Sequence, residues 1–85
     1  MNLSQEKSLI DKGLSYQQGL DLKRAEFCYG SVLKENPSSV EALFNLASLY
    51  HQKGQLSRAI KAFEKVLELN PMHTDASISL SVLYN

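Results

Sequence analysis

The chain has 85 residues, of which 44% are hydrophobic and 21% charged, a composition typical of a folded domain rather than a disordered segment. Its nine basic and nine acidic side chains cancel, so the overall charge does not favour binding to nucleic acid or to an anionic membrane surface. The single cysteine, Cys28, excludes an internal disulfide and a cysteine-based metal site, and we expect it to be a small core residue.

The sequence shows no targeting or membrane-spanning segment. Its first ten residues lack the basic start and apolar run of a signal peptide. No apolar stretch approaches the ~20 residues that cross a bilayer. We therefore expect no membrane insertion and a cytoplasmic location, or else a piece of a longer protein whose targeting segment lies elsewhere.

Helical periodicity dominates the chain, and no stretch alternates with the period of two that marks a strand. We predict five helices, in chain order over about 4–18, 22–35, 38–52, 56–69 and 73–84. The third is among the clearest, because its apolar side chains recur at helical spacing at Leu43, Leu46, Ala47 and Tyr50. The short connections predict that successive helices pack antiparallel.

Asparagine-proline pairs end the second and fourth helices. Asn36-Pro37 and Asn70-Pro71 each close a nearly identical phrase, "LKENP" and "LELNP". The residue before a proline is pushed out of the helical region, which stops a helix there. The two prolines lie 34 residues apart (71 − 37), which indicates that a unit of two helices is repeated.

Other residues mark turns and helix starts. Gly19 and Gly54 lie in the turns inside the two units, and Gly19 comes one residue early, which predicts a slightly different turn. Asp21 is placed to cap the second helix. Ser38, three residues before Glu41, has the spacing of a capping box for the third.

The second unit, residues 40–73, resembles the tetratricopeptide repeat. The residues that carry the resemblance are Leu43, Leu46, Ala47, Tyr50, Gly54, Ala59, Phe63 and Pro71. The first unit, residues 6–39, matches less closely, with Lys12 where a large apolar residue is usual. Residues 74–85 hold one helix, a partial third repeat or a capping helix. The resemblance implies one all-α domain over 1–85, a right-handed superhelical solenoid of antiparallel helix pairs.

In a solenoid of this kind, the first helix of each pair lines a concave face. The resemblance implies a groove for a peptide or protein segment there, with an apolar strip and flanking polar contacts. Its residues are Lys7, Ile10, Leu14, Gln17, Glu41, Phe44, Asn45, Ser48, His51, Gln52, Ile78 and Val82. Family members that hold acidic chaperone tails look like a clamp of lysine, asparagine and arginine. Only Asn45 fits that clamp, so this ligand is not expected.

Nothing in the sequence favours catalysis. The two histidines, His51 and His73, lack metal-ligand spacing, and we expect them to be solvated surface residues. No nucleophile motif or glycine-rich phosphate loop is present. We therefore predict a module that is not an enzyme and needs no metal or cofactor.

The last helix carries apolar residues that no later helix covers, which predicts self-association, as a homodimer, through Ala76, Leu80, Leu83 and Tyr84. The leading hypothesis is a protein–protein interaction scaffold. The alternatives are a self-assembling structural module and an accessory repeat region of a longer protein whose activity lies elsewhere.

Overall fold

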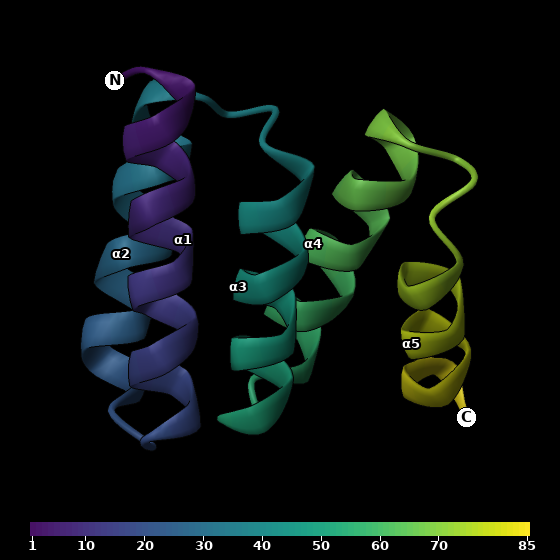
Figure 1. Ribbon diagram of the computed structural model, residues 1–85. Helices are drawn as coiled ribbons and strands as arrows, with labels where there is room; N and C mark the ends of the chain where they lie inside the picture. The colour runs from purple at the N-terminus through teal and green to yellow at the C-terminus, as the bar shows by residue number, and fades with distance from the viewer.

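The computed structural model describes residues 1–85 as five α-helices with no strand (Figure 1). The predicted all-helical class is confirmed, and each boundary lies within two residues of its expected position. The right-handed superhelical path of a longer array stays a prediction. The helices are α1 (Leu3–Gln18), α2 (Leu22–Glu35), α3 (Val40–Gln52), α4 (Leu56–Leu69) and α5 (Thr74–Tyr84).

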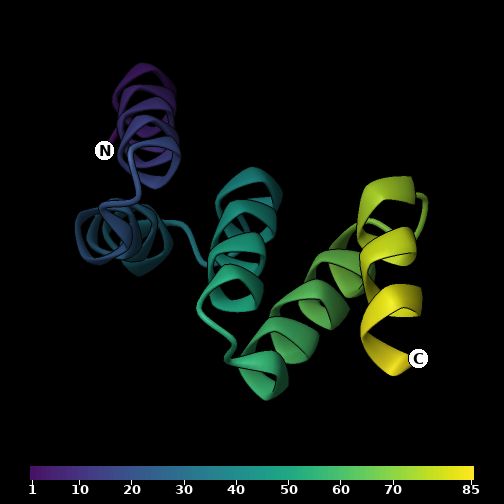
Figure 2. The same ribbon diagram turned by 90° about the horizontal axis from the view of Figure 1, so that it is seen from below.

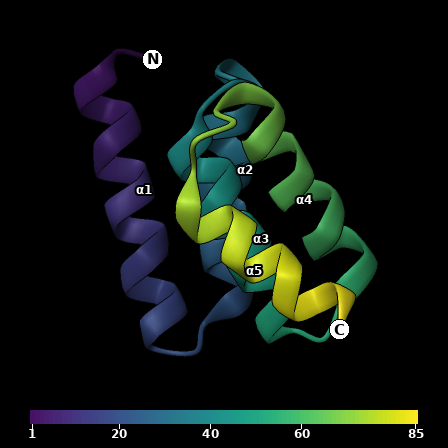
Figure 3. The same cartoon turned by 90° about the vertical axis from the view of Figure 1, so that its right-hand side faces the viewer.

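The helices form a row in which α1 and α2 make one antiparallel pair, α3 and α4 make the next, and α5 packs on α4. Seen from below, α1, α3 and α5 lie along one side of the row, and α2 and α4 along the other (Figure 2). The view from the α5 end shows α1 standing apart on one side, α4 on the other, and α5 in front of α3 (Figure 3).

The largest core cluster joins α3, α4 and α5. Small side chains let the helices approach closely, and larger ones fill the space between them. Its fully buried members include Ala47, Ala59 and Phe63. Two smaller clusters hold α1 and α2 together and join them to α3. Cys28 is buried, as expected of a small core residue.

The outermost helix, α5, is part of this core, which corrects the predicted self-association surface. Ala76 and Leu80 are buried against the α3–α4 pair, and Leu83 is half-buried beside them. Tyr84 is exposed, and its hydroxyl donates a hydrogen bond to Glu64 Oε2 at 2.7 Å. Ala76 and Leu80 therefore cannot contact a second copy, because they are buried within their own chain.

Of the two predicted N-terminal caps, that of α2 is confirmed and that of α3 is not. The Asp21 cap is confirmed, because its Oδ1 accepts from the backbone N–H of Arg24 at 3.3 Å. The prediction of a capping box that begins at Ser38 is wrong. The cap of α3 is Ser39, a buried residue whose Oγ accepts from the Ala42 N–H at 3.3 Å. A shift of one residue matters here, because only the extended residue directly before the helix can accept this bond.

The turn between α1 and α2 also corrects the prediction. It has the same backbone hydrogen bonds as the turn between α3 and α4: the Asp21 N–H donates to Tyr16 O at 2.8 Å, as Gln55 does to Tyr50 at 2.9 Å. The residue with a positive φ is Gly54 (77°) in the second turn but Leu20 (65°) in the first. The early glycine therefore leaves the turn unchanged and places a leucine in a left-handed conformation.

The helix α3 buries two faces because it lies between α2 and α4. In the stripe that the sequence indicates, Leu43 and Ala47 pack in the cluster shared with α4, whereas Leu46 packs with α2 and Tyr50 contacts both clusters. A second stripe, which includes Ala42 and Leu49, faces α1 and α2, and both residues are fully buried. Leu49 packs with Ala25 and Tyr29 of α2. The signal was present, since Ala42, Leu46 and Leu49 also recur at helical spacing.

Candidate binding face

The inner face is the side of the row lined by α1, α3 and α5, where the sequence places a ligand groove. Three of its apolar side chains are exposed: Leu14 at 39%, Ile78 at 57% and Val82 at 60%. They lie on α1 and α5, the two helices that flank α3. These side chains are outside the three core clusters, so the helices do not need them for packing.

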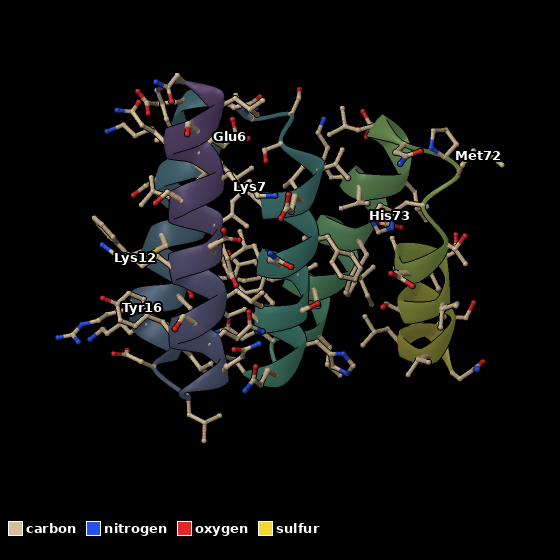
Figure 4. The ribbon with its side chains drawn as sticks, in the orientation of Figure 1. Glu6, Lys7, Lys12, Tyr16, Met72 and His73 are labelled. Atoms are coloured by element: carbon tan, nitrogen blue, oxygen red, sulfur yellow. The ribbon has the colours of Figure 1, made fainter.

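Ile10 is not an exposed groove contact, contrary to the sequence prediction. It is only 3% exposed and packs against Val32 of α2 and Ala42 of α3. Its outer edge lines a cleft of about 370 Å³ between the first turns of α1 and α3. Lys7 and Glu6 of α1 and Glu41 of α3 line this cleft, which therefore holds one positive and two negative charges. Figure 4 shows Lys7 on the side of α1 that faces α3.

Phe44 serves both the core and the inner face. It is half-buried, and its ring meets Phe63 edge-on at a centroid distance of 5.6 Å. It also lies 5.0 Å from the ring of His73. Aromatic pairs with this spacing stabilise a fold beyond the area they bury. A change at Phe44 would therefore alter folding as well as any ligand contact.

His73 is not the solvated surface residue that the sequence suggests. It is half-buried and caps α5, with its Nδ1 accepting from the Ala76 N–H at 3.1 Å. Its position corresponds to Ser39, which caps α3 one unit earlier. His51, in contrast, is exposed at the end of α3 as expected.

The two glutamines predicted as groove contacts are bonded to each other. Tyr29 donates through its hydroxyl to Gln17 Oε1 at 2.8 Å, and Gln17 Nε2 donates to Gln52 Oε1 at 3.1 Å. This chain of bonds crosses from α2 through α1 to α3. Burial of the phenol raises the pKa of Tyr29 to about 12, with a further contribution from Cys28.

The middle of the inner face is polar. Asn45 and Ser48 of α3 are half-buried, and the Asn45 amide has no hydrogen-bonding partner within the chain. Gln55 Oε1 is the only side-chain polar atom that is both buried and without a hydrogen-bond partner, so the unpaired Asn45 amide is not fully buried. An accessible amide beside apolar side chains can both donate to and accept from a peptide backbone.

Other features exclude some kinds of site. No group of three or more histidine, cysteine, aspartate or glutamate side chains is arranged to hold a metal ion. None of the five helices combines the length and apolarity that a bilayer crossing requires. The largest hollow, about 760 Å³, lies between the first turns of α1 and the end of α2, and five of its seven lining residues are polar or charged.

Residues 40–73, the α3–α4 pair with its flanking turns, match the family model of the tetratricopeptide repeat. Residues 40–73 therefore form a tetratricopeptide repeat, as the sequence indicates. No curated protein matches the chain. Repeats of this family act in general as protein–protein interaction modules and are typically non-enzymatic scaffolds.

Proposed function

We propose that the inner face of α1, α3 and α5 binds an amphipathic segment of a protein partner and that the module performs no chemistry itself. The observation that carries this proposal is the unpartnered amide of Asn45, which lies on the helix between those that carry Leu14 and Ile78. Apolar contacts would supply affinity, and the amide would fix the position of the bound backbone.

The exposed apolar side chains are large enough to matter. Full burial of one aliphatic side chain stabilises by about 1.5–3 kcal/mol. Leu14, Ile78 and Val82 are already partly covered, so each has about half of that to contribute. Since 1.4 kcal/mol is a tenfold change in affinity, each contact corresponds to roughly a threefold to tenfold effect.

The test is a selection from a displayed peptide library, followed by fluorescence anisotropy with the selected peptides. Ile78→Ser and Leu14→Ser should each weaken binding by roughly threefold to tenfold, and Asn45→Ala by a smaller factor. Met72→Ser is the matched control, because Met72 is an exposed apolar residue that points away from the inner face (Figure 4). Phe44 is left unchanged because it also supports the core.

Equal affinity of wild type, Ile78→Ser and Leu14→Ser for the selected peptides would contradict the proposal. Circular dichroism of each variant must show unchanged helicity, so that a loss of binding reports on the contact and not on folding.

A further inference from the structure

A second cleft lies at the opposite edge of α1, between α1 and α2. It has a volume of about 460 Å³ and an apolar lining of Leu9, Tyr16, Phe27 and Cys28. Phe27 is 76% exposed, unusually open for a phenylalanine. Figure 4 shows Lys12 and Tyr16 on the side of α1 that faces away from α3, so this cleft is separate from the inner face.

The repeat itself shows what shape fits this cleft. In α3, Leu46 and Tyr50 pack against the cluster formed by α2 and Leu49. The residues 34 positions earlier, Lys12 and Tyr16, occupy the same places on α1 and line the cleft. The corresponding face is covered by a helix in the second unit. A helix therefore fits the first unit in the same way.

The charged side chains around the cleft indicate what kind of helix it would bind. Three cations, Lys12, Lys23 and Arg24, line the cleft, and no carboxylate does. Neither lysine takes part in any of the four ion pairs of the chain. Arg24 pairs with Asp21 at 3.5 Å on the exposed surface and lies 5.9 Å from the Tyr16 ring. The lysine at position 12, where the second unit has leucine, converts an apolar packing position into one that favours an acidic neighbour.

We propose that this outer cleft binds an acidic amphipathic helix of a protein partner, with its apolar face on Phe27 and Tyr16 and its carboxylates beside Lys12 and Lys23. A second copy of the chain paired through the same cleft is disfavoured, because it would bring the same three cations face to face. This surface shares no residue with the inner face proposed above, so the two bind independently.

The test uses two synthetic peptides of about 18 residues, a length at which isolated helices become appreciable. Both carry leucine at helical spacing, and the remaining positions are glutamate and glutamine in one and lysine and glutamine in the other. Fluorescence anisotropy with the full chain should show binding of the acidic peptide and at least tenfold weaker binding of the basic one. The preference should shrink as salt rises from about 0.05 M to about 0.5 M, because exposed charges are screened.

Variants assign the site. Phe27→Ser and Lys12→Glu should each weaken the acidic peptide about tenfold, and both residues are exposed enough for the fold to remain intact. Lys12→Leu, which restores the residue of the second unit, should keep apolar binding but reduce the preference for the acidic peptide. Met72→Ser, at an exposed residue outside both surfaces, is the control and should leave the affinity unchanged.

Several results would overturn the proposal. One is equal binding of the two peptides. Another is that Leu14→Ser, and not Phe27→Ser, abolishes binding of the acidic peptide, which would place its binding site on the inner face. Binding to phosphatidylserine vesicles in place of the peptide, abolished by Phe27→Ser, would make the ligand a lipid. A dimer in sedimentation that Phe27→Ser dissociates would make the occupant a second copy.

Discussion

The two helix pairs follow one plan but differ where their helices touch. In the first pair, Gly13 lies against Tyr29, and a Cβ added at Gly13 would come within 2.6 Å of the ring. In the second, the corresponding positions hold Ala47 and Phe63, both buried. The first pair therefore uses the smallest possible residue to accommodate a tyrosine, whose hydroxyl then reaches Gln17 on α1.

The local signals at the start of the second helix of each pair also differ. The first pair has a good cap, Asp21, but a leucine in the left-handed turn. The second has a glycine in that turn, but Gln55 makes no side-chain cap and leaves its Oε1 buried without a partner. Each pair has one favourable and one unfavourable local choice, which shows that the packing tolerates either fault. Exchanging residues between the pairs tests this.

The largest effect is expected from Gly13→Ala, which would place a methyl group against the Tyr29 ring. Overpacking of a core costs about 1–3 kcal/mol, more than the helix propensity gained, so we expect a net loss of about 1–2 kcal/mol. Urea unfolding followed by circular dichroism measures it. Gly30→Ala is the matched control, because nothing lies within 4 Å of its added Cβ, and it should stabilise by up to about 1 kcal/mol. An equal gain in both variants would rule out the clash.

A second prediction concerns alkaline unfolding. Because burial raises the pKa of Tyr29 from its ordinary 10 to about 12, the folded chain holds this proton more tightly than the unfolded chain. Its contribution is therefore complete below pH 10 and is lost as pH rises from about 10 to 12. Tyr29→Phe should cost about 1 kcal/mol at neutral pH, through the lost hydrogen bond. The stability of Tyr29→Phe should also fall less steeply than that of the wild type as pH rises above 10.

Stability measured from pH 8 to 12 checks this, with Tyr16→Phe as the control for a half-buried phenol. Parallel pH curves for wild type and Tyr29→Phe would refute the prediction.

Leu20→Gly should stabilise the first turn, because a leucine at φ 65° carries a left-handed strain of about 1–2 kcal/mol. Part of that gain is offset by the greater chain entropy of glycine when unfolded, so we expect a net gain of about 0.5–1 kcal/mol. The exposed leucine side chain has little burial to lose. Gly54→Ala, at φ 77°, should shift the denaturation midpoint in the opposite direction. A loss of stability in Leu20→Gly would show that the turn is unstrained.

The smallest effect is expected from Gln55→Asp, which copies the cap of α2 onto α4. A side-chain cap contributes about 0.5–1 kcal/mol, and the change also removes a buried unpaired oxygen. Thermal unfolding should show a slightly higher midpoint, whereas Asp21→Gln, the reciprocal change, should lower it. No change in either variant would mean that the caps are frayed in solution.

Periodicity and proline placement determined the five helices well, because those signals are local. The errors at Ile10, Ser39 and His73 share a cause. Whether an inward-facing isoleucine is exposed depends on how closely α1 approaches α3, and this is set by side chains of α2 and α3 distant in sequence. A histidine that caps a helix and contacts Phe44 likewise depends on a helix two elements away. The outer cleft could not be predicted from the sequence, because Lys12 departs from the repeat pattern and the cleft forms only where α1 packs on α2.

The helix α5 lies at the end of the row and packs mainly on one neighbour, α4, which has a consequence for ligands. The helix packs mainly on α4 and carries Ile78 and Val82, whereas α3 is held on both sides. Structure held by few contacts opens at lower free energy than the rest of a fold. A partner that reaches Ile78 must therefore offset the conformational entropy of steadying α5, while one confined to α1 and α3 meets a surface already fixed. We therefore expect the proposed site on the inner face to bind short and long ligands at different entropic cost.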